Sequence, residues 1–189
     1  MASFSVVYDA CVLYPAPLRD FLMHLALTDL FRAKWTNKIH DEWTENLLAN
    51  RSDLTREQLN RTRDLMNKNV RDCLVTGYEN LIPTLILSDE HGRHVLAAAI
   101  YSGSSVIVTC NLSDFPKIEL EKYNIEALHP DEFISDLIGL NPAKVLKAAA
   151  DHRRSLKNPP KTAEEYLDTL LKQSLPETVS LLKQWIVAI

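Results

Sequence analysis

A central parallel strand is predicted most clearly by residues 106–116, which read VIVTCNLSDFP. Residues 106–109 are uniformly β-branched, as expected for a strand that helices cover on both faces of a sheet. The polar segment 111–114 follows the carboxyl end of this strand. Ligand sites of α/β folds form at the carboxyl ends of parallel strands, so this segment is a candidate part of a functional site.

Strands and helices alternate on both sides of this segment. Short apolar runs predict further strands at residues 4–8, 34–36 and 125–128. Helical spacing of apolar residues is found at residues 18–31, 40–48, 52–69 and 95–100, and another helix is expected to begin at Pro130. This alternation predicts an α/β fold with three layers, α/β/α, around a central parallel sheet.

Local signals mark the start of one of these helices and the end of another. Thr55 and Gln58 have the spacing of a capping box, and Ser52 is an alternative N-cap. Gly103 follows the alanine-rich helix, where glycine commonly terminates a helix.

After the last predicted strand, the alternation of strands and helices gives way to helices alone. From residue 142 onward the pattern predicts two or three helices, with a break at Pro159–Pro160. Between Lys144 and Lys183 there are eight Lys and Arg residues against five Asp and Glu residues, so this segment is basic. We therefore expect an α/β domain at residues 1–138 and a helical C-terminal extension at residues 139–189 that packs on it.

Composition and cysteine usage favour a cytoplasmic protein that does not cross a membrane. The chain has 189 residues, 46% of them hydrophobic, and a formal net charge of −4. No apolar run is long enough to cross a membrane, and residues 1–5 lack the features of a signal peptide. Cys11, Cys73 and Cys110 form no CxxC pair and are expected to be small buried residues, which favours a reducing cytoplasm.

Several carboxylates occupy positions from which they can converge. Asp9 ends the first strand, Glu42 lies on a helix, Asp89 and Glu90 open the alanine-rich helix, and Asp114 follows the central strand. Such oxygen ligands favour Mg²⁺ or Mn²⁺, and a metal site of this kind can activate water against a phosphodiester. Aspartates at strand ends are also common as helix N-caps, so spacing alone leaves both interpretations open.

Four strings resemble the PIN-domain family, and the resemblance covers roughly residues 4–135. VVYDACVL at residues 6–13 resembles the family's first-strand motif, and HDEWTENL at residues 40–47 resembles its second acidic motif. RHVLAAAI at residues 93–100 and VIVTCNLSDFP at residues 106–116 are the most specific, because their order and spacing both fit.

The resemblance implies a PIN fold and Mg²⁺- or Mn²⁺-dependent cleavage of single-stranded RNA, with 5′-phosphate and 3′-hydroxyl product ends. It assigns Asp9, Glu42 and Asp114 to the metal site, with Thr109 and Asn111 as supporting polar groups. Many relatives are toxins of type II toxin–antitoxin pairs. The resemblance therefore also implies a cognate antitoxin as a partner and favours a homodimer.

One position departs from the family pattern. The acid expected two residues before the HVLA string falls on Gly92, which cannot supply a ligand. Asp89, and less strongly Glu90, are the candidates to replace it. If neither reaches the metal, the chain is a catalytically weakened PIN scaffold that binds RNA or protein. A different metal-dependent phosphoesterase on a similar fold is a third, weaker hypothesis.

Other side chains have both a functional and a structural interpretation. Arg93 and Arg51 are candidates to bind RNA phosphates, although Arg51 can equally pair with acids such as Asp53 on a solvated face. His94 is expected to pack or to support the site rather than to act as a base. The three tryptophans are expected in the core: Trp35, Trp43 and Trp185.

Overall fold

The computed structural model describes residues 4–87 and 89–189. Residues 1–3, part of the segment where we expect no signal peptide, lie outside it. Four parallel strands form one sheet in the order β2-β1-β3-β4. They are β1 (Ser5–Tyr8), β2 (Arg32–Lys34), β3 (Val106–Val108) and β4 (Glu126–Leu128).

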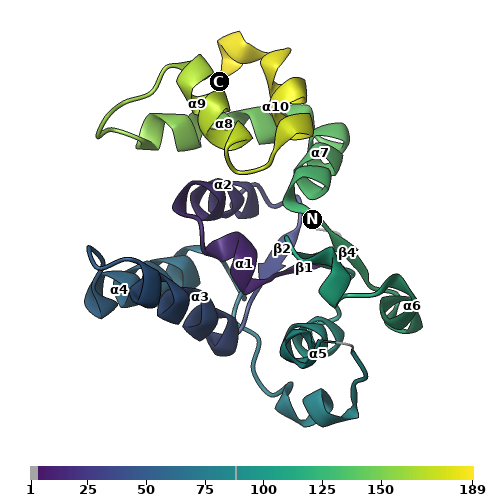
Figure 1. Ribbon diagram of the computed structural model, residues 1–189. Coiled ribbons are helices and arrows are strands. Elements are labelled where there is room, and N and C mark those ends of the chain that lie inside the picture. Colours follow the sequence, from purple (N-terminus) through teal and green to yellow (C-terminus); the bar gives the residue numbers. More distant parts are fainter. Residues whose placement is uncertain (1–3, 88) are drawn as a thin grey trace.

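Helices cover both faces of the sheet, as Figure 1 shows, with α5 on one side and α2 and α7 on the other. This confirms the predicted α/β/α class. The α-helices before the last strand are α1 (Ala10–Leu13), α2 (Ala16–Ala26), α3 (Asn37–Asn50), α4 (Arg56–Asn69), α5 (Arg93–Tyr101) and α6 (Lys117–Leu120). Those after it are α7 (Pro130–Leu140), α8 (Pro142–Ser155), α9 (Ala163–Leu171) and α10 (Pro176–Lys183). Short 3₁₀ turns are η1 (Glu79–Thr84), η2 (Glu90–Gly92), η3 (Leu112–Asp114), η4 (Glu121–Tyr123) and η5 (Ile186–Ala188).

The two central strands are buried on both faces. Val6, Val7 and Tyr8 of β1 and Ile107 and Val108 of β3 have no exposed surface. β-Branched side chains suit this position because they pack well on a pleated surface between two helical layers. Since all four strands run in one direction, their carboxyl ends meet at one edge of the sheet.

Most of the predicted helix signals are confirmed. Thr55 and Gln58 form both halves of the capping box that begins α4, so Ser52 is not the cap. Gly103 has a φ of +62° just beyond α5, where an L-residue would be strained. Pro159–Pro160 separates α8 from α9, and three helices follow residue 141.

Two predicted boundaries were wrong. The helix expected to reach Phe31 ends at Ala26, and the chain then turns through Asp29, whose φ is +57°. The strand expected at residues 34–36 lies earlier, at Arg32–Lys34, because the Thr36 side chain accepts a hydrogen bond from Ile39 N (3.0 Å) and begins α3.

The prediction for the tryptophans is only partly correct. Trp35 and Trp43 are fully buried, but Trp185 follows α10 on the outside of the molecule and is 37% exposed. The cysteines also differ from expectation: Cys73 is buried, Cys11 is partly exposed and Cys110 is exposed.

The C-terminal helices are attached to the sheet domain by polar as well as apolar contacts. The Asp131 carboxylate on α7 accepts the backbone N–H groups of Glu177 (2.9 Å) and Thr178 (2.8 Å), which lie in the first turn of α10. His152 on α8 stacks on Phe21 of α2. The expected boundary between the α/β domain (residues 1–138) and the helical extension (residues 139–189) falls inside α7. This division into two parts stays a prediction.

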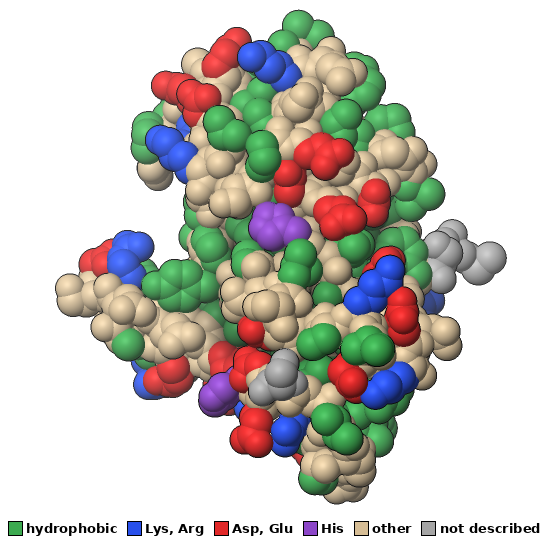
Figure 2. Space-filling view, turned by 45° about the vertical axis from the view of Figure 1, so that its right-hand side comes forward, with side chains coloured by type: hydrophobic (Ala, Val, Ile, Leu, Met, Phe, Trp, Pro, Cys, Tyr) green, Lys and Arg blue, Asp and Glu red, His purple; other side chains and the backbone are tan. Residues whose placement is uncertain are grey.

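In the described part of the chain, no helix has both the length and the apolar character needed to span a membrane. Acidic and basic side chains are interspersed on the face shown in Figure 2. On that face, the described residues form no continuous basic stripe.

Candidate active site

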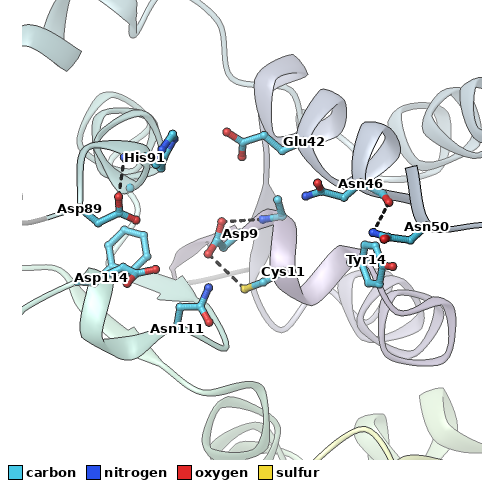
Figure 3. A pocket seen from close by; sticks show the side chains of 13 residues that line it. Asp9, Cys11, Tyr14, Glu42, Asn46, Asn50, Asp89, His91, Asn111 and Asp114 are labelled. Carbon is cyan, nitrogen blue, oxygen red and sulfur yellow. Dashed lines mark hydrogen bonds between the residues drawn. The ribbon is translucent and has the colours of Figure 1, made fainter. Parts of the chain in front are cut away.

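A pocket of 550 Å³ opens where β1 and β3 end. Of the predicted site residues, the structure brings together Asp9, Glu42, Asp89, Asn111 and Asp114 in its lining. They come from four separate segments, namely the end of β1, helix α3, the turn before α5 and the turn after β3 (Figure 3). The remaining predicted site residues lie outside the lining: Glu90, Thr109, Arg51 and Arg93.

Three hydrogen-bond donors hold the Asp9 carboxylate in place. Its Oδ1 accepts the backbone N–H of Ala10 (2.7 Å), and its Oδ2 accepts the Thr109 hydroxyl (2.7 Å) and the Cys11 thiol (3.3 Å). Thr109 Oγ1 in turn accepts the backbone N–H of Asn111 (3.1 Å). Thr109 therefore ties the ends of β1 and β3 together and fixes the carboxylate of Asp9.

The Cys11 thiol is the part of this network that sequence analysis did not identify. Its Sγ lies 3.3 Å from Thr109 Oγ1 and accepts the backbone N–H of Cys110 (3.1 Å). The hydrogen bond with the Cys110 side chain, burial and the nearby Asp9 carboxylate all raise the pKa of the Cys11 thiol far above its usual range. Cys11 thus stays protonated at neutral pH and can donate to Asp9.

Glu42 is anchored by a buried histidine. His94 on α5 is 1% exposed, and its Nε2 lies 2.8 Å from Glu42 Oε1. His94 Nδ1 is buried and has no hydrogen-bond partner among the described residues. The contact with the carboxylate therefore requires a proton on Nε2, which donates to Glu42. This agrees with the expectation that His94 supports the site.

The turn before α5 distinguishes Asp89 from Glu90. Asp89 lines the pocket while its Oδ1 accepts the backbone N–H of His91 (3.0 Å), so it is both an N-cap and a pocket residue. The Glu90 side chain is 79% exposed, lies outside the lining and pairs with Arg93 (3.4 Å). Gly92 lines the pocket, and a Cβ added to it would lie 3.4 Å from the Phe115 ring.

Neither of the predicted phosphate-binding arginines reaches the pocket. Arg93 contacts Glu90 and the Leu87 carbonyl (3.5 Å). Arg51 forms a bidentate pair with the exposed Asp53 (2.8 and 2.6 Å). The alternative in which Arg51 belongs to a solvated, ion-paired face therefore fits the structure, and RNA contact through either arginine stays a prediction.

The carboxylates surround the pocket without forming a tight cluster. Within residues 4–87 and 89–189, no three His, Cys, Asp or Glu side chains are close enough to hold one ion together. Asp89 and Asp114 lie on one side of the pocket, and Asp9 and Glu42 lie toward the other (Figure 3). Carboxylate oxygens are nevertheless the donors that Mg²⁺ and Mn²⁺ prefer, so the chemistry of the lining fits those ions.

Sequence analysis also missed other lining residues, among them Tyr14, Asn46 and Asn50. The signal for the asparagines was present, because Glu42, Asn46 and Asn50 follow one another at intervals of four on α3 and so share a helix face. For Tyr14 the sequence offers no such signal.

Two comparisons with known proteins give matches. Residues 130–184, which contain α7 to α10, match the family model described as VapC50 C-terminal domain. The chain is also 38% identical over 99 residues to "Putative ribonuclease VapC50" of Mycobacterium tuberculosis (strain ATCC 25618 / H37Rv). This similarity covers 51% of the chain and 57% of that relative. No solved structure gives a significant match.

The family model covers only the C-terminal helices. The chain spans little more than half the length of the relative that it matches. Together with the parallel α/β sheet and the motifs at the ends of β1 and β3, these matches show that the chain is similar to VapC-like PIN-domain proteins.

Proposed function

We propose that this protein is a metal-dependent endoribonuclease that cleaves single-stranded RNA, and that it is the toxin of a type II toxin–antitoxin pair. The observation that carries the proposal is the lining of one pocket by Asp9, Glu42, Asp89 and Asp114 at the carboxyl edge of the sheet. The name of the related protein, a ribonuclease, supports the same class of activity. We propose the cytoplasm as its location, and a cognate antitoxin and a second copy of the chain as its partners.

The roles of the protein groups follow from their contacts. Asp9, Glu42, Asp89 and Asp114 would hold Mg²⁺ or Mn²⁺, which when bound activates water and stabilises charge on the scissile phosphate. Thr109 and Cys11 keep Asp9 from rotating away, and His94 does the same for Glu42. Fixed ligands matter because small displacements in a nuclease site cost large factors in rate.

The first test is the metal requirement. A 5′-labelled single-stranded RNA should be cut with Mg²⁺ or Mn²⁺ to give 5′-phosphate and 3′-hydroxyl ends, and EDTA should abolish cleavage. Mn²⁺ binding measured by electron paramagnetic resonance reports on the site independently of activity. Intact RNA with both metals, or undiminished cleavage in EDTA, would count against the proposal. Rapid hydrolysis of DNA or of small phosphate esters would instead support another phosphoesterase activity.

A second test concerns the fourth carboxylate. We expect Asp89→Asn to slow cleavage by about 10- to 100-fold, because asparagine keeps the N-cap but removes a charged ligand. Glu90→Gln is the matched control and should retain activity, since the Glu90 side chain faces solvent. Initial rates with saturating Mn²⁺ measure both effects.

The Gly92→Asp variant tests whether the missing acid at this position weakens the site. The φ of Gly92 is −73°, so its backbone accepts any residue, and Gly92→Ala controls for contact with Phe115. We expect little gain from the added acid because Asp89 already lines the pocket. A large gain, together with normal rates in Asp89→Asn, would instead favour the weakened scaffold that binds RNA or protein.

A third test addresses the His94–Glu42 contact. His94→Leu should weaken Mn²⁺ binding and cleavage by about 10- to 100-fold, because Glu42 loses its buried donor. His94→Gln should recover part of this loss, since an amide N–H can replace Nε2–H. Thermal unfolding of both variants separates a positioning role from a loss of fold. Equal Mn²⁺ affinity in His94→Leu and the unsubstituted protein would contradict this role.

A further inference from the structure

The pocket has a second part whose residues carry no charge. Tyr14, at the end of α1, and Asn46 and Asn50, on α3, lie apart from the side that carries Asp89 and Asp114 (Figure 3). Asn46 and Asn50 are exposed and Tyr14 is half-buried, so all three are open to a ligand.

Their polar atoms are largely free for a ligand. Among the described residues, no hydrogen bond uses the Tyr14 hydroxyl or the Asn46 carboxamide. The Asn50 Nδ2 donates to the Asn46 backbone carbonyl (2.8 Å), which fixes the Asn50 side chain and leaves its Oδ1 as an acceptor. A phenol ring and two carboxamides thus face one space.

The pocket is larger than metal ions alone require. Six waters around one Mg²⁺ occupy about 180 Å³, at roughly 30 Å³ each. The pocket volume is 550 Å³, which leaves room for a group of the size of a nucleobase beside the ion. Along α3, a rise of about 1.5 Å per residue places Asn46 roughly 6 Å and Asn50 roughly 12 Å beyond Glu42. This part of the pocket is therefore adjacent to the carboxylates.

The chemistry of these side chains selects the ligand. A carboxamide offers both a donor and acceptors, which complement the edge of a base, and an aromatic ring offers a stacking surface. Phosphate is a poor match, because this part of the lining has no cation and the remainder carries four carboxylates. An unstacked base of a single strand presents both its face and its edge, whereas a duplex does not.

We propose that Tyr14, Asn46 and Asn50 form a nucleobase subsite that receives a base next to the scissile phosphate of single-stranded RNA. The base stacks on Tyr14, and its edge bonds to the two carboxamides. The proposal rests on the nuclease function proposed above and adds the determinant of where the strand is cut.

The experiment uses the full chain and two readouts. The first is the affinity for fluorescein-labelled hexaribonucleotides of A, C, G and U, measured by anisotropy with Ca²⁺ in place of Mg²⁺. The second is the base preference at each position around the cut, obtained by sequencing the products of a randomised single-stranded RNA. The variants are Tyr14→Ala, Tyr14→Phe, Asn46→Ala and Asn50→Ala. Matched controls are Tyr123→Ala on η4 and Asn60→Ala on α4, both exposed residues outside the pocket.

We expect Tyr14→Ala to weaken binding of the preferred hexamer by about tenfold, as loss of one stacked base does. Tyr14→Phe keeps the ring and should keep most of the affinity. Asn46→Ala and Asn50→Ala should relax the base preference at one position relative to the cut, while the controls change neither readout. A single-stranded DNA of the same sequence shows whether the subsite also accepts deoxynucleotides.

The outcomes separate this inference from the proposed function. If all three alanine variants keep the affinity and base preference of the unsubstituted protein while RNA is cut, the subsite is wrong and the nuclease stands. If no RNA is cut with Mg²⁺ or Mn²⁺, the proposed function fails, and the anisotropy series alone then supports or overturns the subsite.

Discussion

Replacing Asp9 with asparagine is expected to lower the rate of RNA cleavage by on the order of a hundred- to a thousandfold. Asp9 lies at the end of β1 and faces the pocket with a carboxylate that three donors hold in place. Asparagine keeps the shape but removes the charge that would bind Mg²⁺ or Mn²⁺. It also turns an N–H₂ group toward the Thr109 hydroxyl or the Ala10 amide, where an acceptor is needed.

The control for Asp9→Asn is Asp168→Asn, which makes the same change at an exposed position on α9. Initial rates with Mn²⁺ should be normal in Asp168→Asn and nearly abolished in Asp9→Asn. Circular dichroism should show that both variants fold, because the Asp9 side chain bonds only to groups near the pocket. Full activity of Asp9→Asn would remove the basis for a carboxylate-held metal.

The arrangement of Asp9 and Asp114 could be predicted because it depends on the sheet alone. The β-branched run of β3 and the apolar run of β1 define two buried parallel strands, and parallel strands place their carboxyl ends at one edge. The sequence therefore predicted that Asp9 and the segment after β3 would be neighbours. The position of β2 could not be read equally well, because the capping role of Thr36 competes with its tendency to extend a strand.

The contacts of Glu42 and Asp89 were harder to predict, because they depend on packing between helices. The His94–Glu42 hydrogen bond joins α5 to α3, and no sequence period relates two separate helices. Asp89 and Glu90 are neighbours in the chain, and only the geometry of η2 turns one toward the pocket and the other to solvent. The same limit explains why Tyr14, at the end of α1, was not grouped with Asn46 and Asn50 on α3.

Acid is expected to destabilise this protein through two buried histidines, His40 and His152. Burial lowers the pKa of each to about 4, although hydrogen bonding to Asn67 partly opposes this for His40. His40 Nδ1 accepts the Trp43 indole N–H (3.1 Å), so a second ring proton would face a donor. His152 Nδ1 lies 3.1 Å from the Tyr166 hydroxyl in the contact between α8 and α9.

The pH range follows from the sign of these shifts. The pKa of both groups is lower in the folded state than the usual 6.5, so between pH 6.5 and 4 the unfolded chain binds protons that the folded chain does not. The free energy of unfolding is therefore highest above pH 6.5 and falls as the pH drops through this range. At 1.36 kcal/mol per pKa unit, the loss amounts to about 3 kcal/mol for each histidine by pH 4.

Urea unfolding at pH 7.0, 6.0, 5.0 and 4.5 measures this loss, and His152→Asn isolates one histidine. Asparagine can keep an acceptor near the Tyr166 hydroxyl but does not titrate. The free energy of unfolding should therefore fall less steeply below pH 6.5, by the amount that His152 contributes. His91→Asn, at an exposed position, is the matched control and should leave the decline unchanged. An identical decline in His152→Asn and the unsubstituted protein would show that protonation of His152 does not cause the loss of stability in acid, because the rest of the protein is the same in both.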